Sequence, residues 1–407
     1  MEIYPLFQWS GHRDAVYALN QGTERRIVSA GGDGTVAVWD PAQPQLPGRA
    51  LCRLGSGIYA LQPPSPHLNA WIIGSISGEM HFIYETEGAH SAEHTDIHSA
   101  AQSGEQSKGY SGGHSRGRSA EQTDIHSAEQ SGEQSKGYSE GLSEGRSAEQ
   151  SGEHSKDYSG GHLPGHPQVN SPDRSRGSKG LTGLYSEAVG PQPPSIGVHT
   201  GKSPIHDVQF MGHRLWSAHG DGRLLRWSME NRMPVIDQSI KISSGALRCL
   251  MPHPTAPLIA SGSSDGKIRL TDESGELIQV FEAHTLSVFS LLFLVGGKYL
   301  LSGSRDAHLA VWETASGKLL DHFPAHLGTL NQLVAIPECG WVGSAGRDKE
   351  IRLWDAHSLE LRKVINREHF PQHAHTHSVN CLFWMRENRL LLSAGDDRKI
   401  RGWQFGC

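Results

Sequence analysis

Three shortages in this 407-residue sequence narrow the classes of protein to which it can belong. Its few cysteines form no CxxC pair, which argues against a disulfide or zinc framework and indicates reduced thiols. They are Cys52, Cys249, Cys339, Cys381 and Cys407. The longest apolar run, around Val288 to Val295, is much too short to cross a bilayer. The formal net charge of -6 lacks the basic excess that is typical of a nucleic-acid-binding domain.

The first residues, MEIYPLFQWSGHRD, also lack the basic and apolar regions of a secretory signal. Together these shortages predict a soluble, cytoplasmic protein with no membrane contact and no nucleic-acid partner.

Apolar residues at helical spacing are nearly absent as well. Short apolar runs alternate with polar residues and end at glycines, which is typical of β-strands. A unit of strand, glycine-rich turn and second strand recurs along the chain, and its most complete copy is AHLGTLNQLVAIPECGWVGSAGRDKEIRLWD, from Ala325 to Asp355. An Asp marks the turn of six copies, and Ser77 replaces it in a seventh, degenerate copy. The six turn residues are Asp33, Asp221, Asp265, Asp306, Asp348 and Asp397. All but one of the spacings are close to the period of a four-stranded propeller blade.

Seven copies predict an all-β fold, a single seven-bladed β-propeller of four-stranded blades. The last copy has no outer strand before Cys407, and the unused apolar stretch from Ile3 to Gln8 can supply it. We therefore expect residues 3–8 to pair with the strand around Ile400 to Phe405. This pairing closes the ring and removes exposed sheet edges that invite aggregation.

The one long spacing, between Ser77 and Asp221, contains an insert rich in Ser, Gly, Glu, Gln and His. The segment that begins at Ser91 recurs almost unchanged at Ser119, which indicates tandem duplication. Such a composition buries too little apolar surface to offset the entropy of ordering, so the insert is predicted to be disordered.

The predicted organisation is blades 1–2 with the closing strand (1–84), the insert (85–192) and blades 3–7 (193–407). We expect the outer strand of blade 2 near Pro193 to Val198, after the insert. Whether the insert has a function or is an incidental expansion stays open, as does the propeller face from which it leaves.

Five copies share a polar constellation in which Ser precedes the turn Asp by four residues and Trp follows it by six. Its members are His12, Ser29, Asp33 and Trp39; His199, Ser217, Asp221 and Trp227; His284, Ser302, Asp306 and Trp312; His326, Ser344, Asp348 and Trp354; and His375, Ser393, Asp397 and Trp403. Ser, His and Asp together suggest a catalytic triad. An active site is needed only once, however, whereas every blade must satisfy its buried polar groups. The repetition therefore favours a structural tetrad in each of these blades and no catalytic residue.

The motifs GHR...GGDGTVAVWD and AHL...GRDKEIRLWD resemble the WD40-repeat family of the G-protein β-subunit type, over about 300 residues. In that family each tetrad fastens the inner strands of a blade, and the domain is not catalytic. Departures such as Thr271 in the fourth copy, and most of the second copy, are ordinary within the family. We expect these two blades to be the loosest.

The resemblance implies that partners bind on the face that carries the turn Asp and the His loops. The position after the first apolar residue of each inner strand carries Tyr17, Tyr59, His206, Arg248, Phe289, Asn331 and Asn380. The position before the turn Asp carries Gly32, Ile76, Gly220, Ser264, Arg305, Arg347 and Asp396. Aromatic residues and Arg dominate binding hot spots, so the predicted partner-binding residues are Tyr17, Tyr59, His206, Arg248, Phe289, Arg305 and Arg347. The alternative is that the aromatic residues only fill the mouth of the central channel.

Other polar residues give weaker signals. Four histidines before the last blade could hold a transition metal. They are His369, His373, His375 and His377. No Cys or carboxylate completes a set of ligands, so the sequence predicts neither a metal site nor a cofactor. Arginines that recur in the third strands are interpreted as strand surface: Arg269, Arg352 and Arg401.

The sequence thus predicts a non-catalytic scaffold, monomeric by itself, that binds a protein or peptide with acidic and apolar side chains. The alternative is a propeller enzyme with an unrecognised site at the mouth of the channel.

Overall fold

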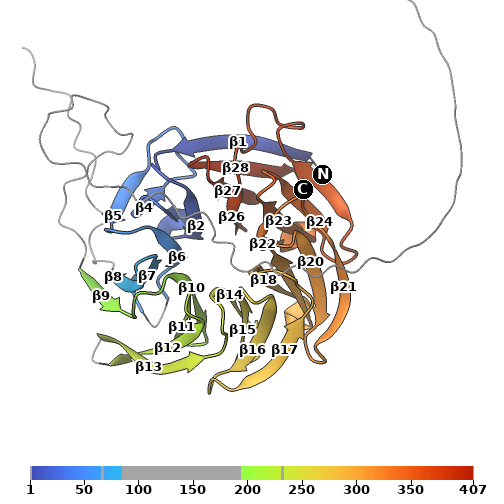
Figure 1. Ribbon diagram of the computed structural model, residues 1–407. Coiled ribbons are helices and arrows are strands. Elements are labelled where there is room, and N and C mark those ends of the chain that lie inside the picture. Colours follow the sequence, from blue (N-terminus) through green and yellow to red (C-terminus); the bar gives the residue numbers. More distant parts are fainter. Residues whose placement is uncertain (1, 66–67, 85–193, 231–232, 407) are drawn as a thin grey trace, which may run out of the picture. The chain divides into compact units, whose positions relative to one another are not determined.

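The computed structural model describes residues 2–65, 68–84, 194–230 and 233–406. These residues form seven four-stranded antiparallel sheets, arranged as the blades of a ring around a central channel (Figure 1). The innermost strand of every blade lies beside the innermost strand of the next, and β2 of the first blade contacts β26 of the last. The predicted all-β, seven-bladed propeller is confirmed.

The strands run outward from the channel in chain order in the first six blades. Blade 1 contains β2 (Val16–Gln21), β3 (Ile27–Gly31), β4 (Thr35–Trp39) and β5 (Arg49–Arg53). Blade 2 contains β6 (Ile58–Gln62), β7 (Ala70–Ser75), β8 (Glu79–Tyr84) and β9 (Ser195–His199). Blade 3 contains β10 (Ile205–Met211), β11 (Arg214–His219), β12 (Arg223–Glu230) and β13 (Met233–Lys241). Blade 4 contains β14 (Leu247–Pro252), β15 (Leu258–Ser263), β16 (Lys267–Asp272) and β17 (Leu277–Glu282).

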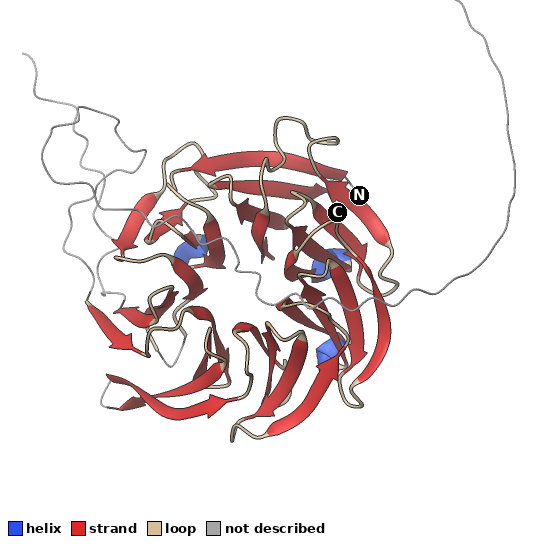
Figure 2. Cartoon of the chain, viewed as in Figure 1, coloured by secondary structure: helices blue, strands red, loops and turns tan. Residues whose placement is uncertain are grey.

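The remaining blades follow the same plan until the last. Blade 5 contains β18 (Val288–Leu294), β19 (Tyr299–Ser304), β20 (His308–Glu313) and β21 (Lys318–Pro324). Blade 6 contains β22 (Leu330–Ile336), β23 (Trp341–Gly346), β24 (Ile351–Asp355) and β25 (Leu361–Ile365). Blade 7 contains β26 (Val379–Met385), β27 (Leu390–Gly395), β28 (Lys399–Gly406) and β1 (Glu2–Ser10). Within the described residues the helices are three single 3-10 turns, η1 (Thr23–Arg25), η2 (Val295–Gly297) and η3 (Pro337–Cys339), drawn in blue in Figure 2.

The two ends of the chain meet in blade 7. Strand β1 is antiparallel to β28, with Ile3 opposite Phe405 and Trp9 opposite Ile400. Trp9 is buried and stacks on Trp39 of blade 1, with the ring centroids 5.3 Å apart. The predicted closure by residues 3–8 is therefore confirmed, and it also joins the cores of the first and last blades.

The insert separates two strands that are neighbours in space. Strand β8 pairs with β9, so that Glu79 lies opposite His199 and Ile83 opposite Ser195. The outer strand of blade 2 therefore follows the insert in the chain, as predicted, and occupies Ser195–His199. The insert at 85–192 lies outside the described residues, and its disorder and its role stay predictions.

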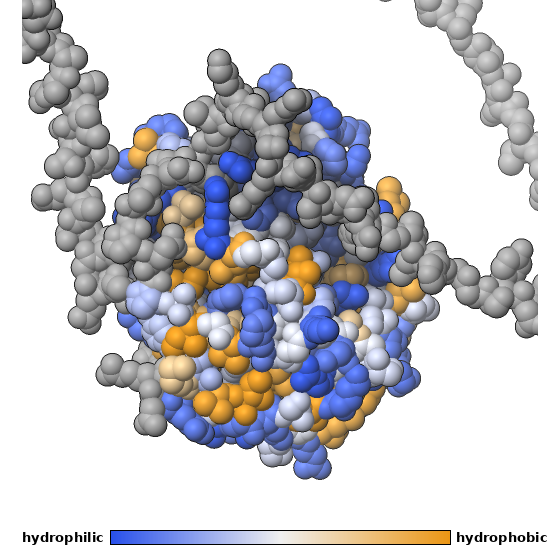
Figure 3. All heavy atoms as spheres, turned by 60° about the vertical axis from the view of Figure 1, so that its left-hand side comes forward, coloured by the Kyte–Doolittle hydropathy of each residue, from blue (hydrophilic) through white to orange (hydrophobic). Residues whose placement is uncertain are grey.

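The second strands form the most buried layer of the propeller. Every residue of β3, β7 and β27 is buried, because these strands are covered by the neighbouring blade on each face. By contrast, the side of the propeller that faces the reader in Figure 3 is a mixed surface, with apolar residues (orange) among hydrophilic ones (blue). In the part of the chain that the structure describes, no helix has the length and apolar character needed to span a bilayer.

Candidate partner-binding face

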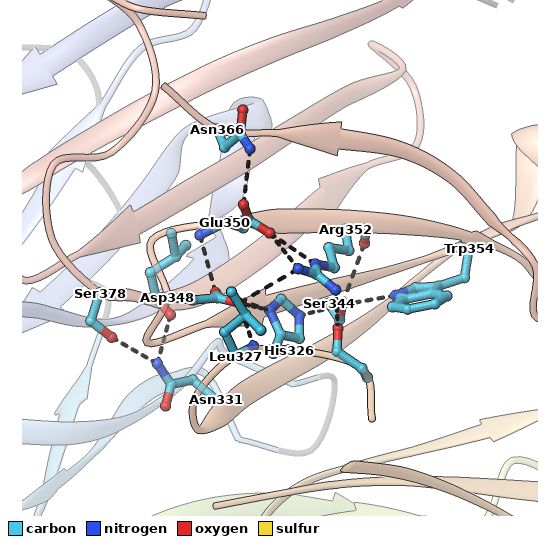
Figure 4. A network of polar contacts seen from close by, with 12 residues as sticks. His326, Leu327, Asn331, Ser344, Asp348, Glu350, Arg352, Trp354, Asn366 and Ser378 are labelled. Carbon is cyan, nitrogen blue, oxygen red and sulfur yellow. Dashed lines mark hydrogen bonds and ion pairs between the residues drawn. The ribbon is translucent and has the colours of Figure 1, made fainter. Parts of the chain in front are cut away.

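Blade 6 shows how the polar constellation of the sequence is built (Figure 4). The carboxylate of Asp348 accepts a hydrogen bond from Nδ1 of His326 at 2.9 Å, and Nε2 of His326 lies 2.7 Å from Oγ of Ser344. The same Oγ accepts the indole N–H of Trp354 at 2.8 Å. A neutral imidazole that donates from Nδ1 and accepts at Nε2 makes this a continuous chain in which each polar atom has a partner. The tetrad thus ties the turn, the loop and two strands of the blade together.

Blades 1, 5 and 7 contain the same arrangement. The His Nε2 to Ser Oγ distances are 2.7 Å for His12 and Ser29, 2.8 Å for His284 and Ser302, and 2.8 Å for His375 and Ser393. In each blade the indole N–H of the Trp reaches the same Ser: Trp39, Trp312 and Trp403. In each blade the His also contacts the turn Asp: Asp33, Asp306 and Asp397. The structure therefore brings together four of the five sets that the sequence predicts.

Burial and hydrogen bonding oppose each other at the turn carboxylates. Burial raises the pKa of Asp33, but the hydrogen bond and charge of His12, with the backbone N–H groups of Arg13 and Thr35, outweigh it and lower that pKa to about 2. Burial likewise raises the pKa of Asp348, and the hydrogen bond from His326 reverses this effect, so that the pKa falls below its usual value. These carboxylates are therefore ionised hydrogen-bond acceptors, as a structural network requires.

The prediction of His199 as a tetrad member is wrong. His199 ends the edge strand β9, and its largely exposed side chain pairs with Glu79 at 2.9 Å. The imidazole that reaches Ser217 comes instead from His219 of β11, at 2.8 Å, and Trp227 still donates to Ser217 at 2.9 Å. Asp221 pairs with Arg223 rather than with a His.

The equivalent position in blade 6 explains this exchange. Gly346 stands two residues after the tetrad Ser, as His219 does in blade 3, and a Cβ there would lie 2.3 Å from Nδ1 of His326. The loop His of blade 6 therefore packs against a residue without a side chain, and in blade 3 the large imidazole of His219 takes the space that a loop His would fill.

The interpretation of the third-strand arginines as strand surface is also wrong. Arg269 and Arg401 are buried, and their guanidinium groups lie 2.6 Å and 2.8 Å from the carboxylates of Asp265 and Asp397. Arg352 lies 4.0 Å from Asp348 and 2.7 Å from Glu350. The arginines neutralise turn carboxylates, and in blade 4, which has no loop His, Arg269 contacts Asp265 and also Ser263, two residues after the position of the tetrad Ser.

A second repeated feature is a β-bulge in the innermost strand of every blade. In each blade the pairing with the second strand skips one residue. The skipped residues, which we call the bulge ring, are Tyr17, Tyr59, His206, Arg248, Phe289, Asn331 and Asn380. A bulge leaves one residue unpaired and redirects its side chain. These are the residues that the sequence places at the partner-binding position.

Five side chains of the bulge ring form one continuous row across blades 1–5. The ring centroids of Tyr17 and Tyr59 are 5.0 Å apart, and those of Tyr59 and His206 are 5.3 Å apart. Nη1 of Arg248 donates to Nε2 of His206 at 3.1 Å, and the Arg248 guanidinium lies 5.7 Å from the centroid of Phe289. All five side chains are half-buried, so the row is packed and still reachable from solvent.

The row carries one positive charge and no negative one. Burial is the largest cause that lowers the pKa of His206 to about 3, with Arg248 adding to it, so the imidazole is neutral and accepts from the guanidinium. Burial raises the pKa of Tyr17 to about 12 and also raises that of Tyr59, so both phenols keep their protons. Within the described residues no carboxylate forms an ion pair with Arg248, and its buried Nε has no hydrogen-bond partner.

The two remaining members of the bulge ring are used differently. Nδ2 of Asn331 donates to the backbone O of Val379 at 2.8 Å, and Nδ2 of Asn380 donates to the backbone O of Val16 at 3.2 Å. Each amide therefore reaches the first residue of the next inner strand and fastens blade to blade. Asn380 also donates to Asp396, the residue before the turn Asp, at 2.7 Å. The bulge ring and the residues before the turn Asp thus lie on one face.

Arg305 and Arg347 extend this face outward from the row. Both are exposed, and the backbone N–H of each bonds the loop that follows a tetrad His, at Ser287 and Thr329. These loops expose Leu286 (45%) and Leu327 (87%), two apolar side chains that the sequence reasoning missed. Their position one or two residues after His284 and His326 was the available signal, because a loop Leu has no core to enter.

Comparison with known proteins agrees with the repeat. The profile described as "WD domain, G-beta repeat" matches residues 3–40, 237–272, 275–313, 317–355 and 367–404. The matched segments leave out residues 41–236, where the polar sets of blades 2 and 3 are incomplete.

Curated relatives match over short stretches. The chain is 41% identical over 70 residues to the pre-rRNA-processing protein IPI3 of Mycosarcoma maydis, which covers 17% of this chain and 12% of that protein. It is 27% identical over 114 residues to the transcription initiation factor TFIID subunit 5 of Caenorhabditis elegans, which covers 27% and 17%. It is 41% identical over 59 residues to the nuclear distribution protein PAC1 of Coccidioides posadasii, which covers 14% and 12%. The chain thus spans less than a fifth of the length of these relatives.

Among solved structures, the chain resembles the WD40 β-propeller domain of Doa1, with a TM-score of 0.61 over 99% of this chain and 97% of that one. At 13% sequence identity this likeness shows the fold alone. The profile match shows WD40 repeats at five positions of the chain, and the described residues form a seven-bladed propeller.

Proposed function

We propose that this protein is a non-catalytic interaction scaffold that binds an acidic, partly apolar peptide segment of a partner protein. The binding face is the one that carries the bulge ring and the turn Asp loops. We also propose that the protein acts as a monomer in the cytoplasm. The buried thiols Cys52, Cys249 and Cys381 support this location, because each is a small core residue without a disulfide.

One observation carries the proposal: the unneutralised cation of Arg248. A half-buried guanidinium without a carboxylate loses hydration and gains little in return. Burial accordingly lowers the pKa of Arg248, and the nearby Arg305 lowers it further. An arginine that only stabilises the fold would form an ion pair with a carboxylate of its own blade, as Arg269 and Arg401 do. Arg248 instead presents its charge between His206 and Phe289, where a carboxylate from another chain completes the pair.

The surroundings of Arg248 define the chemistry of the partner. Phe289 and the two tyrosines offer flat apolar surface on the bulge ring, and Arg305 and Arg347 offer two more cations on neighbouring blades. The exposed Leu286 and Leu327 lie on the loops that touch these arginines. An extended segment that alternates Asp or Glu with apolar residues matches this pattern of charge and apolar surface.

The experiment is a fluorescence-polarisation screen of the full-length chain against peptides that alternate acidic and apolar residues, beside peptides in which Lys replaces each acidic residue. Replacement of Arg248, Arg305 and Arg347 by Gln is expected to weaken binding of the acidic peptides by about 100-fold or more, since charged interface anchors cost about 2 kcal/mol or more each when truncated. The affinity should also fall as salt is raised.

A charge-matched control is the replacement by Gln of three exposed cations on outer strands, Arg49, Lys318 and Lys363. This variant removes the same net charge and is expected to bind within about twofold of the unmodified chain. Equal losses in the two variants, or equal binding of acidic and basic peptides, would rule out this face as the recognition surface.

A further inference from the structure

Blade 5 contains a cluster of imidazoles that the tetrad does not require. Ligand atoms of His284, Asp306 and His322 all lie within 4.8 Å of one another. His322 comes from the outer strand β21, and its ring stacks on that of His308 of β20 with centroids 4.6 Å apart. Nε2 of His322 is buried and has no hydrogen-bond partner among the described residues. Three imidazoles therefore surround one carboxylate, and one ring nitrogen has nothing to bind.

Comparison with other blades shows what is missing at this place. In blades 4, 6 and 7 the residue four positions after the turn Asp is an arginine that faces the carboxylate: Arg269, Arg352 and Arg401. In blade 5 the residue at this position is Ala310. His322 lies directly opposite Ala310 in the sheet, where blades 4 and 6 have Val280 and Val364. An imidazole thus fills the space of the guanidinium but brings no permanent positive charge to Asp306.

We infer that blade 5 binds a divalent transition metal ion, such as Zn2+, through His284, Asp306 and His322. Two imidazoles and a carboxylate are ligands that Zn2+ takes in proteins, with a water or a further residue in the fourth position. The ion supplies beside Asp306 the positive charge that arginines supply in blades 4, 6 and 7. His308, whose side chain is 35% exposed and stacks on His322, lies between this cluster and solvent.

The tetrad can accommodate the ion by a shift of one proton. His284 now contacts Asp306 through Nδ1 and Ser302 through Nε2, at 3.1 Å and 2.8 Å. A metal at Nδ1 requires the proton on Nε2, from which it donates to Oγ of Ser302. That oxygen has two lone pairs and can accept from both His284 and Trp312. The shift keeps the contacts of His284 and Trp312 with Oγ of Ser302, the metal replaces the hydrogen bond between His284 and Asp306, and the hydroxyl hydrogen of Ser302 gives up Nε2 as its acceptor.

The test compares the unmodified full-length chain with the double variant A310R/H322V, which transplants the Arg and Val pair of blades 4 and 6 into blade 5. The measurements are the number of Zn2+ ions bound, by isothermal titration calorimetry, and the visible absorption of the Co2+-loaded chain. We expect the unmodified chain to bind one more Zn2+ than the variant and to show a Co2+ band that the variant lacks. Zn2+ should also raise the melting temperature of the unmodified chain only.

The variant uses a pair that already packs in two blades of this chain, so loss of the fold is not expected, and its melting temperature without metal checks this. The single variant H322V, which keeps Ala310, provides a second comparison and should also lose one ion. Equal stoichiometry and equal Co2+ spectra in all three proteins would overturn the metal site, whatever metal other histidines of the chain bind. The outcome is independent of peptide binding, because none of these residues belongs to the bulge ring.

Discussion

The tetrads and the bulge ring are both placed once per blade, yet they differ in what they leave unsatisfied. In blade 6 each polar group of His326, Ser344, Asp348 and Trp354 has a partner within the blade. In the bulge ring five residue types occupy the seven positions, and Arg248 has a charge that no described carboxylate neutralises. The difference teaches that a feature repeated with the same residues serves the framework, whereas a repeated position with varied residues is free for recognition.

The largest expected effect comes from breaking a tetrad. Ser344→Ala removes the oxygen that contacts Nε2 of His326 and the indole N–H of Trp354, and leaves two buried groups without partners. Each such group costs about 1–3 kcal/mol, so a loss of about 2–4 kcal/mol in the free energy of unfolding is expected from urea denaturation. Peptide binding at the bulge ring should be unchanged at temperatures where the variant is folded.

The matched control is Ser316→Ala, at an exposed serine in the loop between β20 and β21. Its effect should stay within about 0.5 kcal/mol. If both serine variants lose the same stability, the tetrad is not the fastening that the geometry indicates.

A smaller effect is expected from acid. The pKa of Asp33 is lowered to about 2 in the folded chain, so its ionised form contributes stability that is present above the unfolded pKa of 3.8 and is lost as the pH falls toward 2. Asp33→Asn should therefore lower the free energy of unfolding at pH 6 by about 1–2 kcal/mol, which is measured as a lower melting temperature. The difference from the unmodified chain should shrink as the pH falls from 4 to 2. A difference that stays constant over this range would show that the charge of Asp33 is not what stabilises blade 1.

The smallest expected change in stability comes from a substitution in the bulge ring. Arg248→Met removes a half-buried charge that has no carboxylate partner in the described part of the chain, and it keeps an apolar stem against Phe289. Stability should rise by about 0.5–1 kcal/mol, because an uncompensated buried charge is costly, while peptide binding should weaken. The control is Arg347→Met at the exposed end of the same face, which should leave stability unchanged within about 0.5 kcal/mol. A loss of stability in the Arg248 variant would place this residue with the framework.

Two predictions made from the sequence show where repeat spacing succeeds and where it fails. The offset of four and six residues around the turn Asp located Ser344 and Trp354, because strand pairing fixes distances along the chain. The spacing of 22 residues between His and the turn Asp chose His199, and the imidazole of blade 3 comes instead from His219. A loop His is held by the shape of its neighbours, and a residue as large as His219 two positions after the tetrad Ser leaves no space for it.

The prediction that the third-strand arginines lie on the strand surface was wrong for a related reason. Arg401 alternates with apolar residues in the sequence as a surface residue would, yet its side chain is buried beside Asp397. Whether an alternating residue points to solvent or into the space between blades depends on the neighbouring sheet, and the sequence of one strand does not contain that information.

The sequence by itself determined the number of blades, the closure of the ring by residues 3–8 and four of the polar tetrads, because these features depend on local pairing that repeats at a fixed period. The tertiary structure alone decided which residues meet across blades. It brought His206 to Arg248, left Arg248 without a carboxylate among the described residues, and exposed Leu286 and Leu327. It also put His322 beside Asp306, where blades 4, 6 and 7 have an arginine. These contacts join residues from different strands and blades, and their chemistry depends on burial and on neighbours that lie far away in the chain.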